Sequence, residues 1–190
     1  MNRKFKLAIF VSGSGSNAEA VINYFKNHPT ISVELLLSNN PEAYALERAK
    51  KLNVLSKVFD RSQLQAEVSN WLSENKITHI VLAGFLLMIP KCLTDAYPNK
   101  IINIHPSLLP KFGGKGMYGL KIHEAVKKAG ETETGLTIHL VNEKYDDGKI
   151  LKQVHCKVSS TDTAKDISEN VLRLEHFHYP RVIEEWILNS

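Results

Sequence analysis

Short apolar runs alternate with segments of helical periodicity along the first half of the chain. Apolar runs at residues 6–11, 31–37 and 79–83 predict strands, the first of them buried, and 54–59 predicts a weaker strand. Between these runs, apolar side chains recur at the spacing of one helix face. The predicted helices follow the loop at 12–17, cover about 43–52 and include 64–72. This alternation is typical of a parallel sheet with helices on both faces.

The second half predicts a different arrangement of strands. Residues 101–105 form another apolar strand, whereas 134–141 and 150–158 alternate apolar and polar side chains. Two such half-buried strands in succession favour an antiparallel hairpin. Further helices are expected near 91–97, at 120–129 and from about 164 onward, with a break at Tyr179-Pro180. We therefore expect an α/β fold with a Rossmann-like, mostly parallel sheet, helices on both faces and an antiparallel C-terminal strand pair.

A polar pair interrupts the apolar stretch at 101–110, which reads Ile-Ile-Asn-Ile-His-Pro-Ser-Leu-Leu-Pro. Asn103 and His105 are two residues apart, so in a strand both side chains point to the same face. Pro106 lacks the N–H that a central strand needs, which places the pair at the strand's C-terminal end. Ligands bind at that edge of open α/β sheets. The pair is either a ligand site or a turn cap beside a buried structural histidine.

A glycine-rich loop follows the first predicted strand and opens a helix. Gly13-x-Gly15-x-x-Ala18 satisfies the dinucleotide-binding pattern with alanine in its third position. That pattern also requires an acidic residue at the end of the second strand, where this chain has Ser-Asn-Asn at 38–40. The loop also lacks the Gly-Lys-Ser/Thr ending of a P-loop. The free N–H groups of a helix N-terminus favour a single phosphate group there, with a tight structural turn as the alternative.

The polar pair needs an anionic partner if the histidine is to act as an acid or base. Tyr-Asp-Asp-Gly at 145–148 lies on the predicted turn between the last two strands and supplies Asp146 and Asp147. Adjacent acids beside a glycine are also typical of a solvated turn. Together with Asn103 and His105, these carboxylates become the best available third member of a site.

Length and composition limit the class of protein. A chain of 190 residues with 43% hydrophobic and 23% charged residues is typical of one globular domain and excludes a disordered or fibrous protein. The net charge of +4 suits a small anionic ligand. We expect no nucleic-acid partner, because no cluster combines aromatic and basic residues. No membrane association is expected either, because no apolar run approaches about 18 residues.

The cysteines and the remaining histidines add further expectations. Cys92 and Cys156 follow no disulfide or metal spacing and are expected to be small buried groups. With no apolar signal segment after Met-Asn-Arg-Lys, a cytoplasmic location is the simplest expectation. His176 and His178 have a spacing found in metal sites, but no suitable third ligand is near, so no metal is expected.

Several motifs cover nearly the whole chain. They are Ser-Gly-Ser-Gly-Ser-Asn at 12–17, Ala-Gly-Phe at 83–85, Asn-Ile-His-Pro-Ser-Leu-Leu-Pro at 103–110, Thr-Ile-His at 137–139, Tyr-Asp-Asp-Gly at 145–148 and Glu-His-x-x-Tyr-Pro at 175–180. Together they resemble the phosphoribosylglycinamide formyltransferase family, a branch of the folate-dependent formyltransferases. The resemblance implies a single formyltransferase domain over 1–190, with a phosphate-binding half at about 1–100 and a catalytic and folate-binding half at about 84–190.

The resemblance implies a reaction in purine (IMP) biosynthesis. The formyl group of 10-formyltetrahydrofolate would pass to the amine of 5'-phosphoribosylglycinamide by direct amine attack. Asn103 would donate to the oxyanion that forms. His105 would be a second donor or the general acid, and Asp146 would hold His105 and help to move a proton. Formyl transfer to an amino sugar and hydrolysis of the donor remain alternatives on the same fold.

The resemblance also implies binding residues. Those expected to hold the phosphate are Gly15, Ser16 and Asn17, with Glu175 on the ribose hydroxyls. Those expected to contact the folate are Leu86, Leu87, Met88 and Ile89, with Arg61 as a weaker match. Two features depart from the family: some relatives carry arginine where Leu87 stands, and the segment 113–119 differs from the commoner Pro-Gly-x-His version.

Two histidines and the state of assembly complete the expectations. His139 and His123 could both border the site. The alternative for His139 is a strand surface, and for His123 the surface of a helix is the favoured interpretation. The sequence leaves a monomer and a homodimer equally open.

Overall fold

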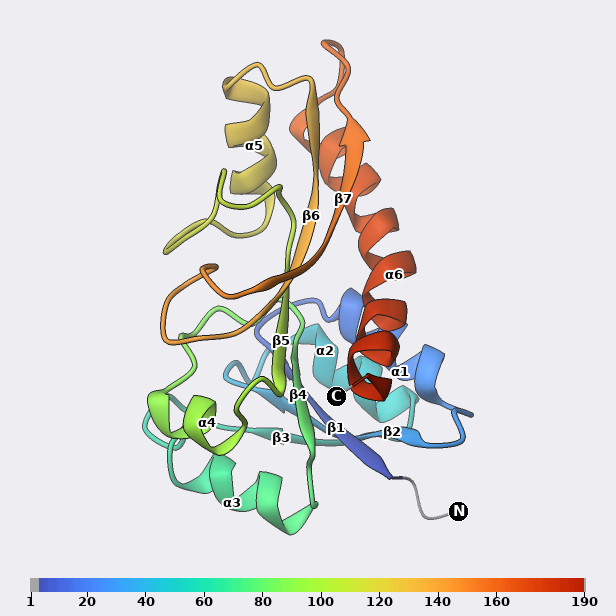
Figure 1. Ribbon diagram of the computed structural model, residues 1–190, viewed down its shortest axis with the longest axis vertical. Helices are drawn as coiled ribbons and strands as arrows, with labels where there is room; N and C mark the ends of the chain where they lie inside the picture. Colours follow the sequence, from blue (N-terminus) through green and yellow to red (C-terminus); the bar gives the residue numbers. More distant parts are fainter. Residues whose placement is uncertain (1–3, 190) are drawn as a thin grey trace.

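Seven strands form one sheet in the order β3-β2-β1-β4-β5-β6-β7 in the computed structural model, which describes residues 4–189 (Figure 1). The strands are β1 Phe5–Val11, β2 Ile31–Ser38, β3 Leu55–Val58, β4 His79–Leu82, β5 Ile101–His105, β6 Glu133–Leu140 and β7 Ile150–Lys157. Neighbours from β3 to β5 pair in parallel, while β6 pairs antiparallel with both β5 and β7. The predicted mixed sheet is therefore confirmed.

Helices cover both faces of the sheet because the buried strands are apolar on both sides. In β1, Leu7, Ile9 and Val11 belong to one hydrophobic cluster, and Ala8 and Phe10 belong to another. The helices are α1 Ser16–Phe25, α2 Tyr44–Lys51, α3 Glu67–Glu74, α4 Lys91–Ala96, α5 Leu120–Lys128 and α6 Ala164–Leu188. The first cluster takes side chains from α1, α2, α5 and α6, and the second from α3 and α4.

The last helix, α6, runs for 25 residues without interruption, so the predicted break at Tyr179-Pro180 is wrong. Proline in a helix interior removes the bond to the carbonyl four residues earlier, that of His176, at a cost of about 3 kcal/mol. Around it, Tyr179, Pro180, Val182 and Ile183 are all buried. Burial of these apolar groups outweighs the missing backbone bond and keeps the helix continuous.

The hydroxyl of Tyr179 fixes the middle of α6 to the sheet. Its Oη lies 2.8 Å from the carbonyl oxygen of Leu82 and 3.3 Å from that of Ile102. Leu82 ends β4, and Ile102 immediately precedes Asn103 in β5. The helix is therefore tied to the two strand ends on which the predicted polar pair depends.

Replacement of the tyrosine tests this link. In Tyr179→Phe the buried hydroxyl is lost while the ring stays, so we expect the free energy of unfolding to fall by about 1–3 kcal/mol. Denaturant titration measures the change. Tyr44→Phe is the matched control, because the Tyr44 side chain is half exposed, and its stability should change by less than about 0.5 kcal/mol. Equal losses in the two variants would contradict a stabilising role for the Tyr179 hydroxyl.

The structure also shows where the two cysteines lie and whether any helix could cross a membrane. Cys92 is exposed rather than buried, because only Leu93 of the short helix α4 packs into the core, and Cys156 on β7 is partly buried. Both are free thiols. Within residues 4–189, no helix combines the length and the apolar composition needed to cross a bilayer.

Candidate active site

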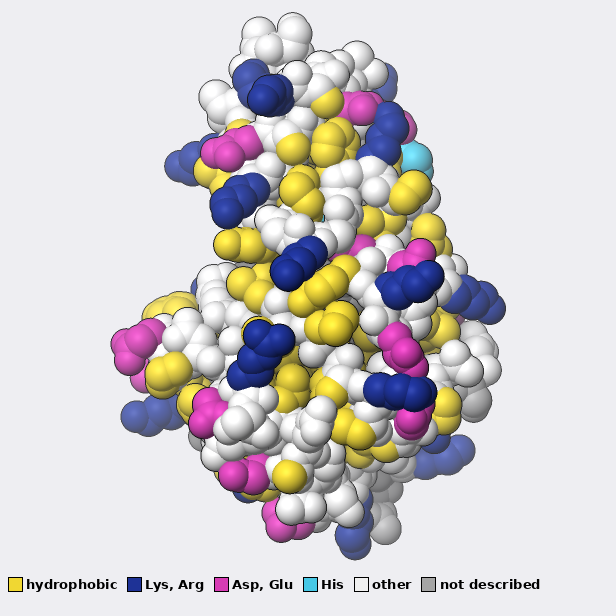
Figure 2. Space-filling view, turned by 90° about the vertical axis from the view of Figure 1, so that its left-hand side faces the viewer, with side chains coloured by type: hydrophobic (Ala, Val, Ile, Leu, Met, Phe, Trp, Pro, Cys, Tyr) yellow, Lys and Arg dark blue, Asp and Glu magenta, His cyan; other side chains and the backbone are white. Residues whose placement is uncertain are grey.

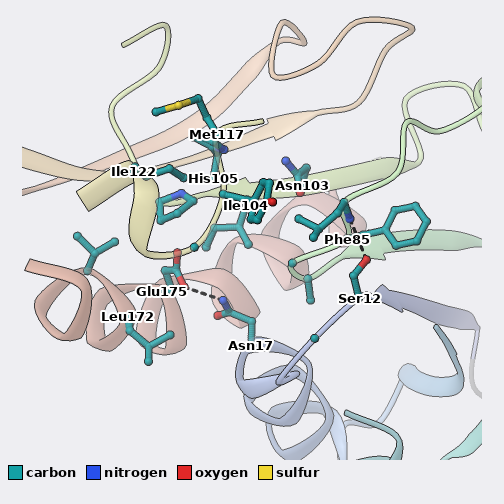
Figure 3. A pocket seen from close by; sticks show the side chains of 18 of the residues that line it. Ser12, Asn17, Phe85, Asn103, Ile104, His105, Met117, Ile122, Leu172 and Glu175 are labelled. Carbon is teal, nitrogen blue, oxygen red and sulfur yellow. Dashed lines mark hydrogen bonds between the residues drawn. The ribbon is translucent and has the colours of Figure 1, made fainter. Parts of the chain in front are cut away.

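A cleft of about 450 Å³ opens at the carboxyl ends of β1, β4 and β5. The strand order reverses here, since β2 lies on one side of β1 and β4 on the other, and such a switch point leaves a crevice. Asn103 and His105 both line the cleft, as predicted from their spacing (Figure 3). The glycine loop after β1, the segment after β4, the loop before α5 and one face of α6 form the other walls.

The surface around α4 and α5 carries exposed apolar side chains. Leu86, Met88, Tyr118 and Leu120 are each between 43% and 48% exposed. Figure 2 shows apolar side chains gathered across the middle of this face, with Lys and Arg side chains around them. An apolar opening of this kind suits a ligand that is in part aromatic or aliphatic.

The glycine loop turns tightly against α2. Gly15 has a φ of 73°, and a Cβ there would lie 2.4 Å from the Cβ of Ala45, so a side chain is excluded. Helix α1 begins at Ser16 with Gly15 as its N-cap, and no side chain of the described residues caps it. The first N–H groups of the helix are therefore left for a ligand, which is the arrangement of an anion site.

Asn103 and His139 stand opposite each other on β5 and β6 and bond through their side chains. Nδ2 of Asn103 lies 3.1 Å from Nε2 of His139, and Nδ1 of His139 lies 2.8 Å from the carbonyl oxygen of Leu140. A carbonyl can only accept, so in the neutral ring Nδ1 carries the hydrogen and Nε2 accepts from the amide. His139 therefore borders the site and orients Asn103, whose second N–H has no acceptor among residues 4–189.

His105 meets Asp146 from the turn between β6 and β7. Nδ1 of His105 lies 3.5 Å from Oδ2 of Asp146, and Nε2 lies 2.9 Å from the carbonyl oxygen of Phe112. Because that carbonyl accepts a hydrogen from Nε2, Nδ1 is the nitrogen that can gain or lose a proton beside the carboxylate. Burial lowers the pKa of His105, against the opposing charge of Asp146, so the ring is neutral at pH 7.

The carboxylate of Asp146 accepts one backbone N–H and lies beside two histidine rings. The N–H of Gly114 donates to Oδ2 at 2.8 Å, and Nε2 of His139 lies 3.7 Å from Oδ1. Burial raises the pKa of Asp146, but the neighbouring His139, the neighbouring His105 and the N–H of Gly114 together outweigh this effect, so the pKa lies below its usual value. Asp146 is therefore ionised beside a neutral histidine.

The two adjacent acids have different surroundings, which the sequence left open. The side chain of Asp146 is 12% exposed, whereas that of Asp147 is 56% exposed and lies 3.6 Å from Nζ of Lys144. Gly148 closes the turn, since a Cβ there would lie 1.7 Å from the carbonyl oxygen of Leu140. Of the two carboxylates, Asp146 is the one within reach of His105.

Asn17 and Glu175 join α1 to α6 at the other end of the cleft. Nδ2 of Asn17 donates to Oε2 of Glu175 at 2.7 Å (Figure 3). Burial raises the pKa of Glu175 from 4.5 to about 7, although the bond from Asn17 opposes this. Oδ1 of Asn17 is buried and has no partner among the described residues. The pair therefore offers hydrogen-bonding capacity that the protein itself leaves unused.

His123 lies at the site, although a position on the helix surface was the favoured prediction. The residue is 3% exposed and lines the cleft. Burial lowers its pKa to about 4, and its Nδ1 is buried without a partner among residues 4–189. Its position in the sequence could have indicated this burial, because His123 lies on the same face of α5 as the apolar residues Ile122 and Val126.

The residues expected to contact folate lie in different environments. Leu86 lines the cleft and Met88 is exposed outside the cleft lining, whereas Leu87 packs against the second hydrophobic cluster. Ile89 is buried within that cluster, and Arg61 is exposed on the turn after β3, outside the cleft lining. Binding of folate by these five residues stays a prediction.

No three His, Cys, Asp or Glu side chains in the described part of the chain lie close enough to hold a metal ion. His176 and His178 lie on α6, outside the lining of the cleft.

Comparisons with known proteins define the class. The family described as formyl transferase matches residues 5–183. A phosphoribosylglycinamide formyltransferase of Bacillus subtilis (strain 168) is 35% identical over 187 residues, which cover 95% of this chain and 93% of the relative. The chain therefore belongs to the formyl transferase family.

Other relatives carry the same name. The chloroplastic phosphoribosylglycinamide formyltransferase of Arabidopsis thaliana is 38% identical over 95% of this chain, which spans 65% of the length of that relative. Glycinamide ribonucleotide transformylase 1 of Geobacillus kaustophilus has a solved structure with a TM-score of 0.86 at 34% identity, covering 95% of this chain and 97% of that chain.

The raised pKa of Glu175 predicts a pH dependence of stability. Between pH 4.5 and about 7 the folded protein keeps a proton that the unfolded chain releases, so the Glu175 contribution to stability falls as the pH rises. Glu175→Gln keeps the shape without the titration. We expect the unfolding free energy of Glu175→Gln, relative to the original chain, to rise by about 2–3 kcal/mol from pH 4.5 to 8.

Denaturant unfolding at several pH values measures this difference between the two proteins. Other titrating groups act in both proteins and cancel. A difference that stays constant over the interval would show that the folded and unfolded states bind the Glu175 proton equally well.

Proposed function

We propose that this chain transfers the formyl group of 10-formyltetrahydrofolate to the amine of 5'-phosphoribosylglycinamide. One observation carries the proposal: Asn103, His105 and Asp146 converge on a cleft whose other end is an anion-binding glycine loop. The activity named for the Bacillus subtilis relative, of which this chain covers 93%, supports the same reaction. The expected division into a phosphate-binding half and a catalytic half agrees with this arrangement and is part of the proposal.

The cleft orders the substrates along its length. The phosphate would lie at the N–H groups of Gly15, Ser16 and Asn17, where the helix end favours an anion. The ribose hydroxyls would bond the unused polar atoms of Asn17 and Glu175. This brings the amine toward Asn103, and the folate would lie against the apolar opening that includes Leu86.

The folate supplies the formyl carbon that the amine attacks. As the new C–N bond forms, negative charge develops on the formyl oxygen, where the free N–H of Asn103 donates to it. A fixed donor in such a place typically lowers the barrier by about 3–4 kcal/mol. His139 contributes indirectly, because its bond prevents the Asn103 amide from turning away.

His105 carries the proton, and Asp146 stabilises the charge that His105 gains. The attacking amine must lose a proton, and the departing folate nitrogen must gain one. Nδ1 of His105 can accept and return a proton, while the ionised Asp146 beside it stabilises the imidazolium that forms. The Nε2 bond to the Phe112 carbonyl keeps the ring in the orientation that this exchange requires.

Substitution of the two adjacent acids tests these roles. Asp146→Asn keeps the shape but removes the charge, so we expect kcat to fall by about 100- to 10,000-fold. His105→Ala should lower kcat by a similar factor, because it removes the other member of the pair. Asp147→Asn is the matched control and should stay within about twofold of the original chain, because its side chain is exposed. A large loss in Asp147→Asn with little effect of Asp146→Asn would reverse the assignment.

A direct assay distinguishes the acceptors. The protein is given 10-formyltetrahydrofolate with 5'-phosphoribosylglycinamide, with an amino sugar or with no acceptor. We expect deformylated folate and formylated ribonucleotide to appear together, and only with the ribonucleotide. Release of formate without an acceptor would instead support hydrolysis of the donor, and turnover with the amino sugar would identify a different transferase.

Cytoplasmic location and a monomeric or dimeric state stay predictions from the sequence.

A further inference from the structure

The cleft has no cationic side chain to hold a phosphate. Its lining residues in the described part of the chain include neither lysine nor arginine. A phosphate at the glycine loop would therefore rely on backbone N–H groups and the dipole of α1, together with the hydroxyls of Ser14 and Ser16, which also line the cleft. Its affinity then depends on the direction in which the peptide units of the loop point.

Two consecutive peptide units of the loop are held by α2. The carbonyl of Gly13 accepts from the N–H of Ala45 at 3.2 Å, and the carbonyl of Ser14 accepts from Nε of Arg48 at 2.9 Å. In a planar trans peptide, the carbonyl and the following N–H point in opposite directions. The N–H groups of Ser14 and Gly15 are therefore turned away from α2, toward the cleft that both residues line.

Arg48 is itself held in place. It forms an ion pair with Glu19 in the first turn of α1, and its guanidinium lies 4.9 Å from the ring centre of Tyr44. Its side chain is 25% exposed and is not part of the cleft lining. Because Glu19 neutralises its charge, Arg48 acts on the loop through the position of its donor rather than through a long-range field.

We propose that Arg48 is a positioning residue for the substrate phosphate, which holds the Ser14–Gly15 peptide unit so that its N–H faces the anion. This inference rests on the proposed function for the identity of the phosphate-bearing substrate. Helix α2, none of whose residues lines the cleft, would thus take part in substrate binding through Arg48.

The kinetic test compares two variants on the same helix. In Arg48→Ala we expect KM for 5'-phosphoribosylglycinamide to rise about tenfold, the loss of one charge-assisted hydrogen bond, with kcat and KM for the folate changed by less than about threefold. Lys51→Ala is the matched control, because Lys51 also lies over the Tyr44 ring, at 5.8 Å, but makes no bond to the loop. Its KM values should equal those of the original chain.

The same acceptor without its phosphate separates positioning from general damage. If Arg48 acts through the phosphate, the dephosphorylated acceptor should have a high KM that is the same for the original chain and for Arg48→Ala. A rise of similar size for both acceptors, or no rise for either, would overturn the proposal.

Inorganic phosphate provides a readout that does not depend on activity. Phosphate should raise the melting temperature of the original chain and of Lys51→Ala, and the shift should be largely lost in Arg48→Ala. If the original chain shows no formyl transfer but this pattern appears, the proposed function fails and the role of Arg48 stands. An equal shift in all three proteins would overturn the role of Arg48 whatever the reaction proves to be.

Discussion

The largely buried carboxylate of Asp146 is the constraint on which the proposed catalytic end of the cleft depends. A carboxylate away from water is costly unless donors surround it. Here the N–H of Gly114, in the loop between β5 and α5, donates to the carboxylate, and His105 at the end of β5 and His139 in β6 lie beside it. They meet only when the β5–β6 register and the β6–β7 turn are both correct. The cost of leaving this charge unpaired therefore links the fold to the chemistry.

The two ends of the cleft use different physical means. At the catalytic end, the side chains of Asn103, His105 and Asp146 are oriented by neighbours that leave selected atoms free. At the proposed phosphate end, the backbone N–H groups of the loop are the proposed binding groups, and two hydrogen bonds from α2 hold the loop from behind. Formyl transfer requires side chains that can accept and return a proton. The phosphate takes no part in the reaction, so fixed backbone dipoles are enough to bind it.

Most of the fold could be predicted because its signals are local. Apolar runs, helical spacing and turn residues identified the strands and helices and the antiparallel pair. The exception was Tyr179-Pro180, where the local rule against proline was overridden by burial of the surrounding side chains. The predicted burial of Cys92 and the favoured surface position of His123 were both wrong: Cys92 is exposed and His123 is buried. Burial of a helix residue depends on what packs against that helix.

The sequence by itself determined that Asn103 and His105 share one strand face, that a glycine loop opens a helix and that an acidic turn follows. Only the tertiary structure decided between Asp146 and Asp147, brought His123 to the cleft, set His139 against Asn103 and set Arg48 behind the loop. Spacing along the chain specifies the direction of a side chain within its own element. Which groups it meets, and whether water reaches it, depend on elements far away in the sequence.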